Sequence, residues 1–371
     1  MERKKICWIS PDSFLDTDTP VVKELASTYN IYWTVILKKN NSSDDVNFVK
    51  SKLAGVPVNV EFYKLKTRIR SPFHIKEIAQ IIKKARNINP DIFYLSESFM
   101  PYGSFLYKHF LPINKCVVAC HNVTTPKGAK NEKLASWYTD KWLSTFTNIQ
   151  TFSKNQQDEL EKRYKGKNVL MTHLALKDYG EPTAKIDKTS LPYVRFLVFG
   201  NILHYKRIDL LLKAVNILYD KGIKKFKVRI AGNCKTWDEE YAPLITHPEM
   251  LELDIRRVPN NEVANLFADS HYFVMPYQDI AQSGAMVVAI RYNLPLVVSD
   301  IPQFQEFVKD GESGIVFKSQ DEHSLAEKLE WIIEHHKDIY PNLCESQRRF
   351  AEENLTIESI ALKYITYFDK L

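Results

Sequence analysis

The sequence predicts an α/β protein made of two doubly wound domains, each a parallel sheet with helices on both faces. The chain has 371 residues, which exceeds the size that one hydrophobic core usually fills. Short runs of β-branched and aromatic residues alternate with helical patterns from end to end, as in βαβ units. One segment without periodicity, residues 177–192, interrupts the alternation and is the best linker candidate. We therefore expect two domains with a cleft between them.

Seven strands are predicted in the first half, each an apolar or β-branched run. They are residues 5–10, 31–37, 58–65, 91–97, 115–120, 148–153 and 168–174. Helical patterns lie between most of them. Thr19 followed by Pro20 predicts the start of the first helix, because a hydroxyl residue caps a helix well and proline fits its first position.

A second series of strands and helices follows the linker. Its predicted strands are residues 195–200, 225–231, 251–258, 272–276, 295–299 and 314–317, and helical patterns cover 208–219 and 261–268. Beyond about residue 340 the pattern is helical to the end. We expect an N-terminal domain at 1–188, a C-terminal domain at 189–352 and a final helix at 353–371 that packs back on the N-terminal domain.

Composition narrows the class of protein. Hydrophobic residues make up 44% and charged residues 26%, which is typical of a globular protein. The apolar run after Met1–Lys5 is too short for a signal peptide or a membrane span, so we expect a cytoplasmic protein. The five cysteines lack a histidine at ligand spacing and are interpreted as reduced thiols, with no metal site. The net charge of +6 leaves anionic substrates, anionic membranes and nucleic acid open.

Three glycines stand at strand-to-helix junctions of the second half: Gly200, Gly232 and Gly284. In an open α/β sheet, ligands bind at this edge, where helix N-termini present N–H groups to phosphates. Each glycine alone is explained as simply by a tight turn. Lys206 and Arg207 follow the first junction and favour a diphosphate. The segment 275–284 adds hydroxyls, an amide and a carboxylate just before a helix predicted at 285–292.

Several motifs of the second half resemble one known group of enzymes. They are Phe199–Ile202 through Tyr205–Leu211, Arg229–Gly232, Met275–Tyr277 with Gln282–Gly284, Leu294–Asp300, and Glu306–Val308 with Asp310–Gly314. Their order and spacing are similar to the C-terminal half of retaining GT-B glycosyltransferases, the glycosyl transferases group 1 type. The likeness is strong from about residue 195 to 318. Before that it is looser, carried by Val118–Val123 and Phe152–Lys154.

The resemblance implies a GT-B fold of two Rossmann-like domains facing a central cleft. It implies that a nucleotide sugar, linked to UDP or GDP, binds the C-terminal domain and that the acceptor binds the N-terminal one, without a metal or other cofactor. Lys206 occupies the position of the lysine that contacts the donor diphosphate. Asn201 stands where the family has an arginine. Ile280 and Val288 occupy the positions of two family glutamates, and Asp279 is a substitute for the first.

Candidate site residues follow from these motifs and from the strand ends. The catalytic candidates are His121, which ends an apolar strand, Lys206 and Asp279. The donor-binding candidates are Gly200, Asn201, Lys206, Arg207, Gly232, Asn233, Val258, Tyr277, Gln282, Ser283, Gly284 and Ala285. The acceptor-side candidates are Ser10, Asp12, Ser13 and Asn122. No glycine-rich loop follows the first strand, so acceptor contact is favoured there over phosphate binding.

A basic stretch runs from Lys64 to Arg86, with cationic residues at Lys64, Lys66, Arg68, Arg70, Lys76, Lys83, Lys84 and Arg86. Ile75, Ile78, Ile82 and Ala85 recur at helical spacing and leave lysines on the other face. A helix packed on the sheet with a solvated basic face explains this pattern. The functional interpretation is docking on anionic lipid at the inner membrane face, near a lipid-linked acceptor.

The sequence thus favours a hexosyltransferase that moves a sugar from a nucleotide sugar to a saccharide acceptor, with retention, in bacterial capsule or lipopolysaccharide synthesis. Two alternatives stay open: a GT-B nucleotide-sugar epimerase, and a two-domain binding protein without chemistry. A dinucleotide oxidoreductase is disfavoured because no Gly-x-Gly-x-x-Gly follows the first strand. Nucleic acid is not an expected partner, because no aromatic and basic binding module is present.

Overall fold

The structure is a computed structural model that describes residues 3–40, 43–68, 71–96, 102–124, 132–183, 188, 191–280 and 282–371. The chain divides into two compact units, residues 1–175 with 354–371, and residues 176–353. The sequence placed the boundary at 188 instead. Residues 178–183 lie with the second unit because they bond to its helices: Tyr179 N–H donates to Tyr292 Oη, and Thr183 N–H donates to Asn265 Oδ1.

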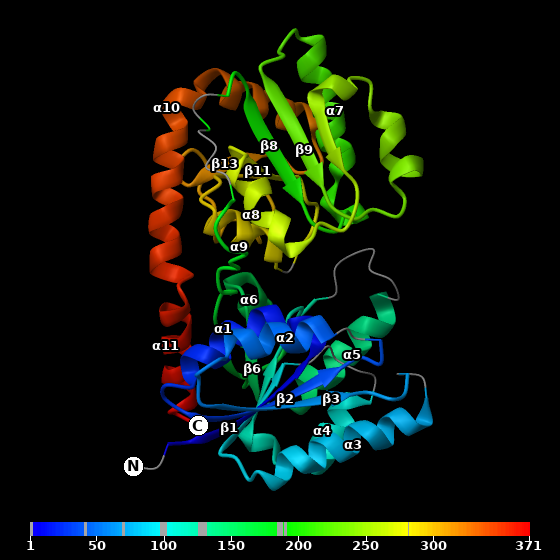
Figure 1. The fold of residues 1–371 in the computed structure, drawn as a ribbon, viewed down its shortest axis with the longest axis vertical. Coiled ribbons are helices and arrows are strands. Elements are labelled where there is room, and N and C mark those ends of the chain that lie inside the picture. Colours follow the sequence, from blue (N-terminus) through cyan, green and yellow to red (C-terminus); the bar gives the residue numbers. More distant parts are fainter. Residues whose placement is uncertain are drawn as a thin grey trace. The chain divides into compact units, whose positions relative to one another are not determined.

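The first unit is a seven-stranded parallel sheet in the order β3-β2-β1-β4-β5-β6-β7 (Figure 1). Its strands are β1 (Lys5–Pro11), β2 (Asn30–Leu37), β3 (Val58–Lys64), β4 (Ile92–Ser96), β5 (Cys116–Ala119), β6 (Asn148–Thr151) and β7 (Asn168–Met171). Its helices are α1 (Leu15–Leu25), α2 (Ser43–Lys52), α3 (Pro72–Asn87), α4 (Gly103–Phe110), α5 (Glu132–Thr145), α6 (Lys154–Arg163) and α11 (Ile357–Phe368).

The second unit is a six-stranded parallel sheet in the order β10-β9-β8-β11-β12-β13. Its strands are β8 (Val194–Phe199), β9 (Phe226–Ala231), β10 (Leu251–Asp254), β11 (Tyr272–Met275), β12 (Leu296–Ser299) and β13 (Gly314–Phe317). Its helices are α7 (Ile208–Asp220), α8 (Asn260–Ala268), α9 (Gly284–Arg291) and α10 (Glu322–Asn354), the last of which ends at the first residue of the returning segment.

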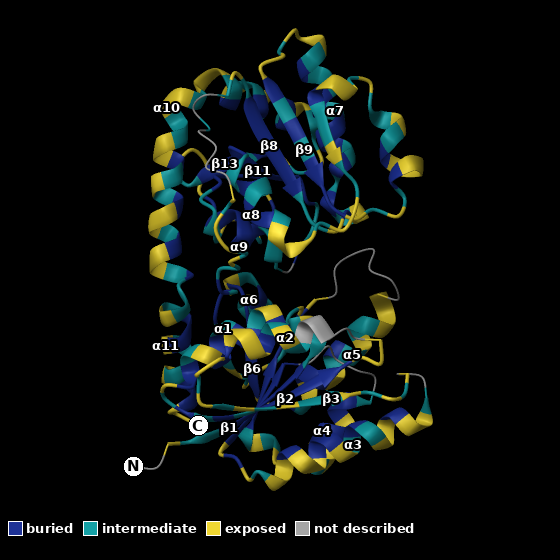
Figure 2. Ribbon diagram, in the orientation of Figure 1, coloured by how far each residue is buried: buried dark blue, intermediate teal, exposed yellow. Residues whose placement is uncertain are grey.

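Each strand predicted from the sequence is present, and each sheet has buried strands at its centre (Figure 2). Parallel strands covered on both faces are apolar throughout rather than alternating, which explains why their runs were recognisable. The core of the first unit has two parts, one on each face of its sheet. The predicted strand 251–258 is shorter than expected, because β10 ends at Asp254.

The prediction for the start of the first helix is wrong. The helix α1 begins at Leu15, directly after a 3-10 turn at Asp12–Phe14, and Pro20 lies inside it. Thr19 does not cap the helix; it is buried, and its hydroxyl donates to the Leu15 carbonyl. The fixed φ of proline suits a helix, so Pro20 is accommodated with the loss of one main-chain donor.

The helix α11 packs on the first unit although it ends the chain. Tyr364 and Phe368 lie in the core beside Trp8 and Tyr94, whose rings stack with centroids 3.7 Å apart. The Gln150 amide donates to the Tyr364 hydroxyl at 2.6 Å. This aromatic cluster is the reason that residues 354–371 belong with the N-terminal unit.

Candidate functional site

The site residues of the second unit gather at the carboxyl edge of its sheet. The strand order reverses between β8 and β11, so the helices that follow these two strands lie on opposite faces. Such a switch point is where open α/β sheets bind ligands. The loop after β8 carries Gly200 to Arg207, and the segment after β11 carries Pro276 to Ser283.

Main-chain and ring contacts hold these two segments together. The Gln278 N–H donates to the Tyr205 carbonyl at 2.9 Å. The Tyr205 and Tyr277 rings meet edge to face with centroids 5.8 Å apart. The Lys206 Nζ lies 5.4 Å from the centre of the Tyr277 ring. The structure thus brings Lys206, Tyr277 and the start of α9 into one neighbourhood.

Lys206 is the most unusual cation of the site. It is only 6% exposed, and burial lowers the pKa of its ammonium to about 8. Its Nζ donates to the Phe199 carbonyl at 3.4 Å, which uses one of its three donors. No carboxylate pairs with it among the described residues of the chain. A buried ammonium held by one long hydrogen bond is suited to receive an anion.

Arg207 is placed differently from its neighbour. Its backbone is left-handed, with φ of 49°, and its guanidinium forms a two-bond pair with Asp209, at 2.9 and 2.8 Å. This pair raises the pKa of Arg207 and lowers that of Asp209, in each case through the hydrogen bonds between them opposing the effect of burial. The Arg207 charge is therefore already engaged at the start of α7.

Two glycines allow the loops after β8 and β9 to touch. A Cβ at Gly232 would lie 2.0 Å from the Gly200 carbonyl oxygen, so no side chain fits there. The Ile202 N–H donates to the Asn233 carbonyl at 2.9 Å, which joins the same two loops. Gly200 itself has φ of +98°, which favours glycine. Gly232 thus serves loop packing as well as any ligand.

The segment before α9 ends in a helix cap. The Ser283 hydroxyl accepts a hydrogen bond from Met286 N–H at 3.1 Å, and Tyr277 is fully buried behind it. Asp279 accepts from the Gln303 amide at 3.3 Å. Gln282 and Ala285 are half-buried beside the cap, Asn201 is exposed, and Val258 is half-buried in the loop before α8. Ile280 and Val288 are buried apolar residues, so neither position carries a charge.

The first-unit candidates separate into buried and exposed groups. Ser10 is fully buried, where its hydroxyl donates to Asp18 at 2.6 Å and accepts from the Trp33 indole at 3.0 Å. Asp12 accepts from the Lys38 N–H at 3.0 Å and pairs with its ammonium at 2.8 Å. Both side chains are therefore committed to the fold. Ser13 and Asn122 are exposed.

The His121 ring is held between two phenyl rings at the carboxyl end of β5. Phe14, from the turn after β1, stacks on one face at 4.0 Å, and Phe152 stacks on the other at 4.5 Å. Because both faces are covered, only the edge of the imidazole is available for hydrogen bonds. The stack also fixes the orientation of that edge.

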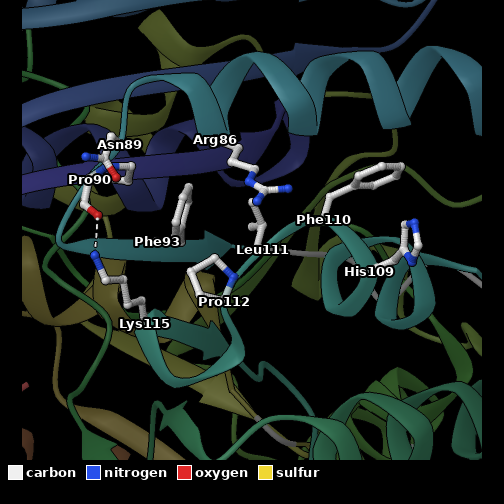
Figure 3. Close-up of a pocket in the computed structure, with 9 residues that line it drawn as sticks. All are labelled: Arg86, Asn89, Pro90, Phe93, His109, Phe110, Leu111, Pro112 and Lys115. Carbon is white, nitrogen blue, oxygen red and sulfur yellow. Dashed lines mark hydrogen bonds between the residues drawn. The ribbon is translucent and has the colours of Figure 1, made fainter.

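Sequence reasoning missed three residues of these neighbourhoods. Tyr205 and Lys177 lie at the second-unit site, and Asp18 is buried under the Ser10 loop. Lys177 falls in a segment without periodicity, and Asp18 falls in the mistaken helix start, so neither carried a signal. A pocket of about 390 Å³ lies elsewhere, at the amino edge of the first sheet, with Arg86, His109 and Lys115 in its lining (Figure 3).

Comparisons with known proteins agree with this placement. Residues 194–335 match the family described as glycosyl transferases group 1. The second unit belongs to this family. The sequence has no significant match among curated proteins.

Solved structures resemble the whole chain. HepE from Anabaena, in complex with UDP and glucose, superposes with a TM-score of 0.75 at 13% identity, covering 100% of both chains. S. aureus TarM, in complex with UDP, has a TM-score of 0.68 at 11% identity, covering 99% of this chain and 100% of its own. WaaG, a glycosyltransferase involved in lipopolysaccharide biosynthesis, has 0.66 at 11%, covering 98% of each. The fold is therefore GT-B, and the chain is a nucleotide-sugar-dependent glycosyltransferase.

Proposed function

We propose that the chain transfers a sugar, with retention, from a UDP-linked donor to a lipid-linked saccharide in the synthesis of a bacterial surface polysaccharide. The single observation that carries the donor part is the buried Lys206 ammonium at the β8–β11 switch point. Of the two nucleotides considered, UDP is preferred over GDP because HepE and TarM are both named as UDP complexes.

The roles of the second-unit residues follow from charge development in the reaction. As the sugar leaves, negative charge accumulates on the nucleotide diphosphate. Lys206 and the N-terminus of α9, beginning at Gly284, stabilise that charge. Asp279, kept in place by Gln303, binds sugar hydroxyls where the family carries a glutamate. In the first unit, the His121 edge binds the donor sugar, and the exposed Ser13 and Asn122 contact the acceptor.

The membrane part of the proposal rests on the first unit. Lys76, Lys83, Lys84 and Arg86 are exposed on α3, whereas Ile78, Ile82 and Ala85 face the core. Arg70 lies outside the described residues. Ile75 is 40% exposed, which corrects its expected place among the buried residues and adds apolar surface to the basic helix.

Exposed aromatic rings accompany these cations. Phe73 on α3 is 72% exposed and Phe105 on α4 is 69% exposed. The first turns of the two helices are neighbours, since the His74 and Tyr102 rings are 6.1 Å apart. Cationic side chains beside exposed rings favour the interface of an anionic membrane. Among the described residues, no helix has the length and apolar character needed to cross a bilayer.

Screening of donors with the full chain tests the central claim. A ligand that binds only the folded protein raises its stability, by about 2.7 kcal/mol at a hundred times Kd. UDP should raise the melting temperature, and a UDP sugar should be consumed when membrane lipid extract is added as acceptor. Release of a free sugar without acceptor would indicate the epimerase instead. Binding without any turnover would indicate a binding protein.

A further inference from the structure

Lys177 lies directly against the first residue of α9. A Cβ built on Gly284 would lie 3.2 Å from the Lys177 Nζ and 3.7 Å from its Cε. The ammonium therefore occupies the space that a side chain at position 284 would need. Ser283 caps the helix at the same point, so Lys177 lies where the free N–H groups of α9 begin.

The segment that carries Lys177 is anchored on the far end of the same helix. Asp178 pairs with Arg291 at 2.8 Å. The Tyr292 hydroxyl accepts from Tyr179 N–H at 3.0 Å and donates to the Gly180 carbonyl at 2.9 Å. These contacts follow Lys177 immediately in the chain, so they limit how far its main chain can move from α9.

The local electrostatics call for an anion. A helix N-terminus carries a partial positive charge, and an ammonium beside it is repelled unless a negative group lies between them. Lys206, buried beside Tyr277, adds a second positive charge to this neighbourhood, and Tyr277 is adjacent to the cap residue Ser283. Asn201 supplies no charge where the resemblance predicts an arginine.

We propose that Lys177 is a second phosphate-binding lysine, which supplies from the connecting segment the charge that is absent at Asn201. This inference rests on the proposed function, because it assigns a further contact to the same nucleotide diphosphate. Gly284 has a defined role in it: the absence of a side chain leaves room for the Lys177 ammonium at the helix start.

Binding of UDP and of uridine to the full chain tests this contact. Lys177→Ala should weaken UDP about tenfold or more, the scale of a hydrogen bond to a charged group, and leave uridine unchanged. Lys177→Arg should recover most of the loss. A structural role would instead weaken UDP and uridine alike. Lys227→Ala removes an equal charge from β9, where the ammonium bonds to the Glu249 carbonyl, and should change neither ligand.

The outcomes separate the two levels of the proposal. Wild-type protein that binds neither UDP nor GDP contradicts the proposed function itself. Loss of UDP binding in Lys206→Ala, with Lys177→Ala equal to wild type, keeps the function and refutes the role of Lys177. Equal losses of UDP and uridine in Lys177→Ala also refute it. Gly284→Ala provides a second measurement, because its Cβ must displace the ammonium; it should weaken UDP more than uridine.

Discussion

At the scale of single residues, Lys206 and Arg207 show how neighbours in sequence take different roles. The Lys206 ammonium is buried and has one long hydrogen bond, whereas Arg207 is paired with Asp209 through two. A donor phosphate would supply the ammonium with its missing acceptors. It would gain much less from a guanidinium that already has a carboxylate.

We expect Lys206→Ala to reduce UDP affinity and kcat/KM by roughly 1.5–3 kcal/mol, the range for hydrogen bonds to charged groups. Arg207→Ala should change them much less, since it removes an internal ion pair at the start of α7. Calorimetric titration with UDP and donor kinetics measure both. Small and equal effects from the two substitutions would place the diphosphate elsewhere.

The depressed pKa of Lys206 predicts a pH dependence of donor binding. The ammonium is charged below about pH 8 and neutral above it, because burial disfavours the charged form. UDP binds the charged form, so the Kd should be constant up to about pH 7 and rise above pH 8, by at most about tenfold per pH unit. Titrations from pH 6.5 to 9.5 measure this. Lys206→Ala, which lacks the titrating group, should show a flatter profile.

At the scale of elements, α1 places a carboxyl group inside the first unit. Asp18 is 3% exposed and accepts from Ser10. Burial raises the pKa of this carboxyl to about 6, against the opposing effect of the side chains of Ser10, Ser96 and Trp8. The folded protein therefore holds this proton more tightly than the unfolded chain does.

Asp18→Asn should remove a pH-dependent part of the stability. Because the folded pKa lies above the unfolded one, the contribution of Asp18 is fully present below about pH 4 and lost as pH rises through about 6. The variant keeps an acceptor for Ser10 without a charge, so its advantage over wild type should grow between pH 4 and 7. Urea unfolding at several pH values measures the difference. Parallel curves for the two proteins would contradict the buried carboxylate.

At the scale of the whole molecule, the last helix completes the first unit. Phe368 is fully buried against Tyr94 and Tyr364, while Leu362 on the same helix is 62% exposed. Phe368→Ala should lower the free energy of unfolding of the first unit by about 3–5 kcal/mol, as for other buried aromatic truncations. Leu362→Ala is the matched control and should have little effect. Urea titration followed by tryptophan fluorescence suits this test, since Trp8 lies in the same cluster.

Attraction to a membrane is also a property of the whole molecule. The protein should float with anionic vesicles at low salt and not with neutral ones. Screening acts over roughly 8 Å at physiological ionic strength, so added salt should release it. Charge reversal at Lys83, Lys84 and Arg86 should abolish flotation, whereas reversal at Lys224, Lys309 and Lys318, exposed on the second unit, should not. A wild type that ignores anionic vesicles would favour a soluble acceptor.

The sequence by itself determined the strands, the fold class and the main phosphate-binding candidate. Buried parallel strands require apolar runs, and the junctions that follow them require glycine, so both leave a local pattern. Lys206 was found because its motif is contiguous with such a junction. The resemblance then added the family and the expected donor.

Only the tertiary structure decided which polar residues are available to a ligand. Ser10 and Asp12 follow β1 as expected, yet their partners Asp18, Trp33 and Lys38 come from neighbouring elements and commit them to the fold. Lys177 reaches α9 only because its segment is anchored to Arg291 and Tyr292, far along the chain. Local patterns reflect backbone conformation and burial, whereas the partners of a polar side chain depend on contacts between distant residues.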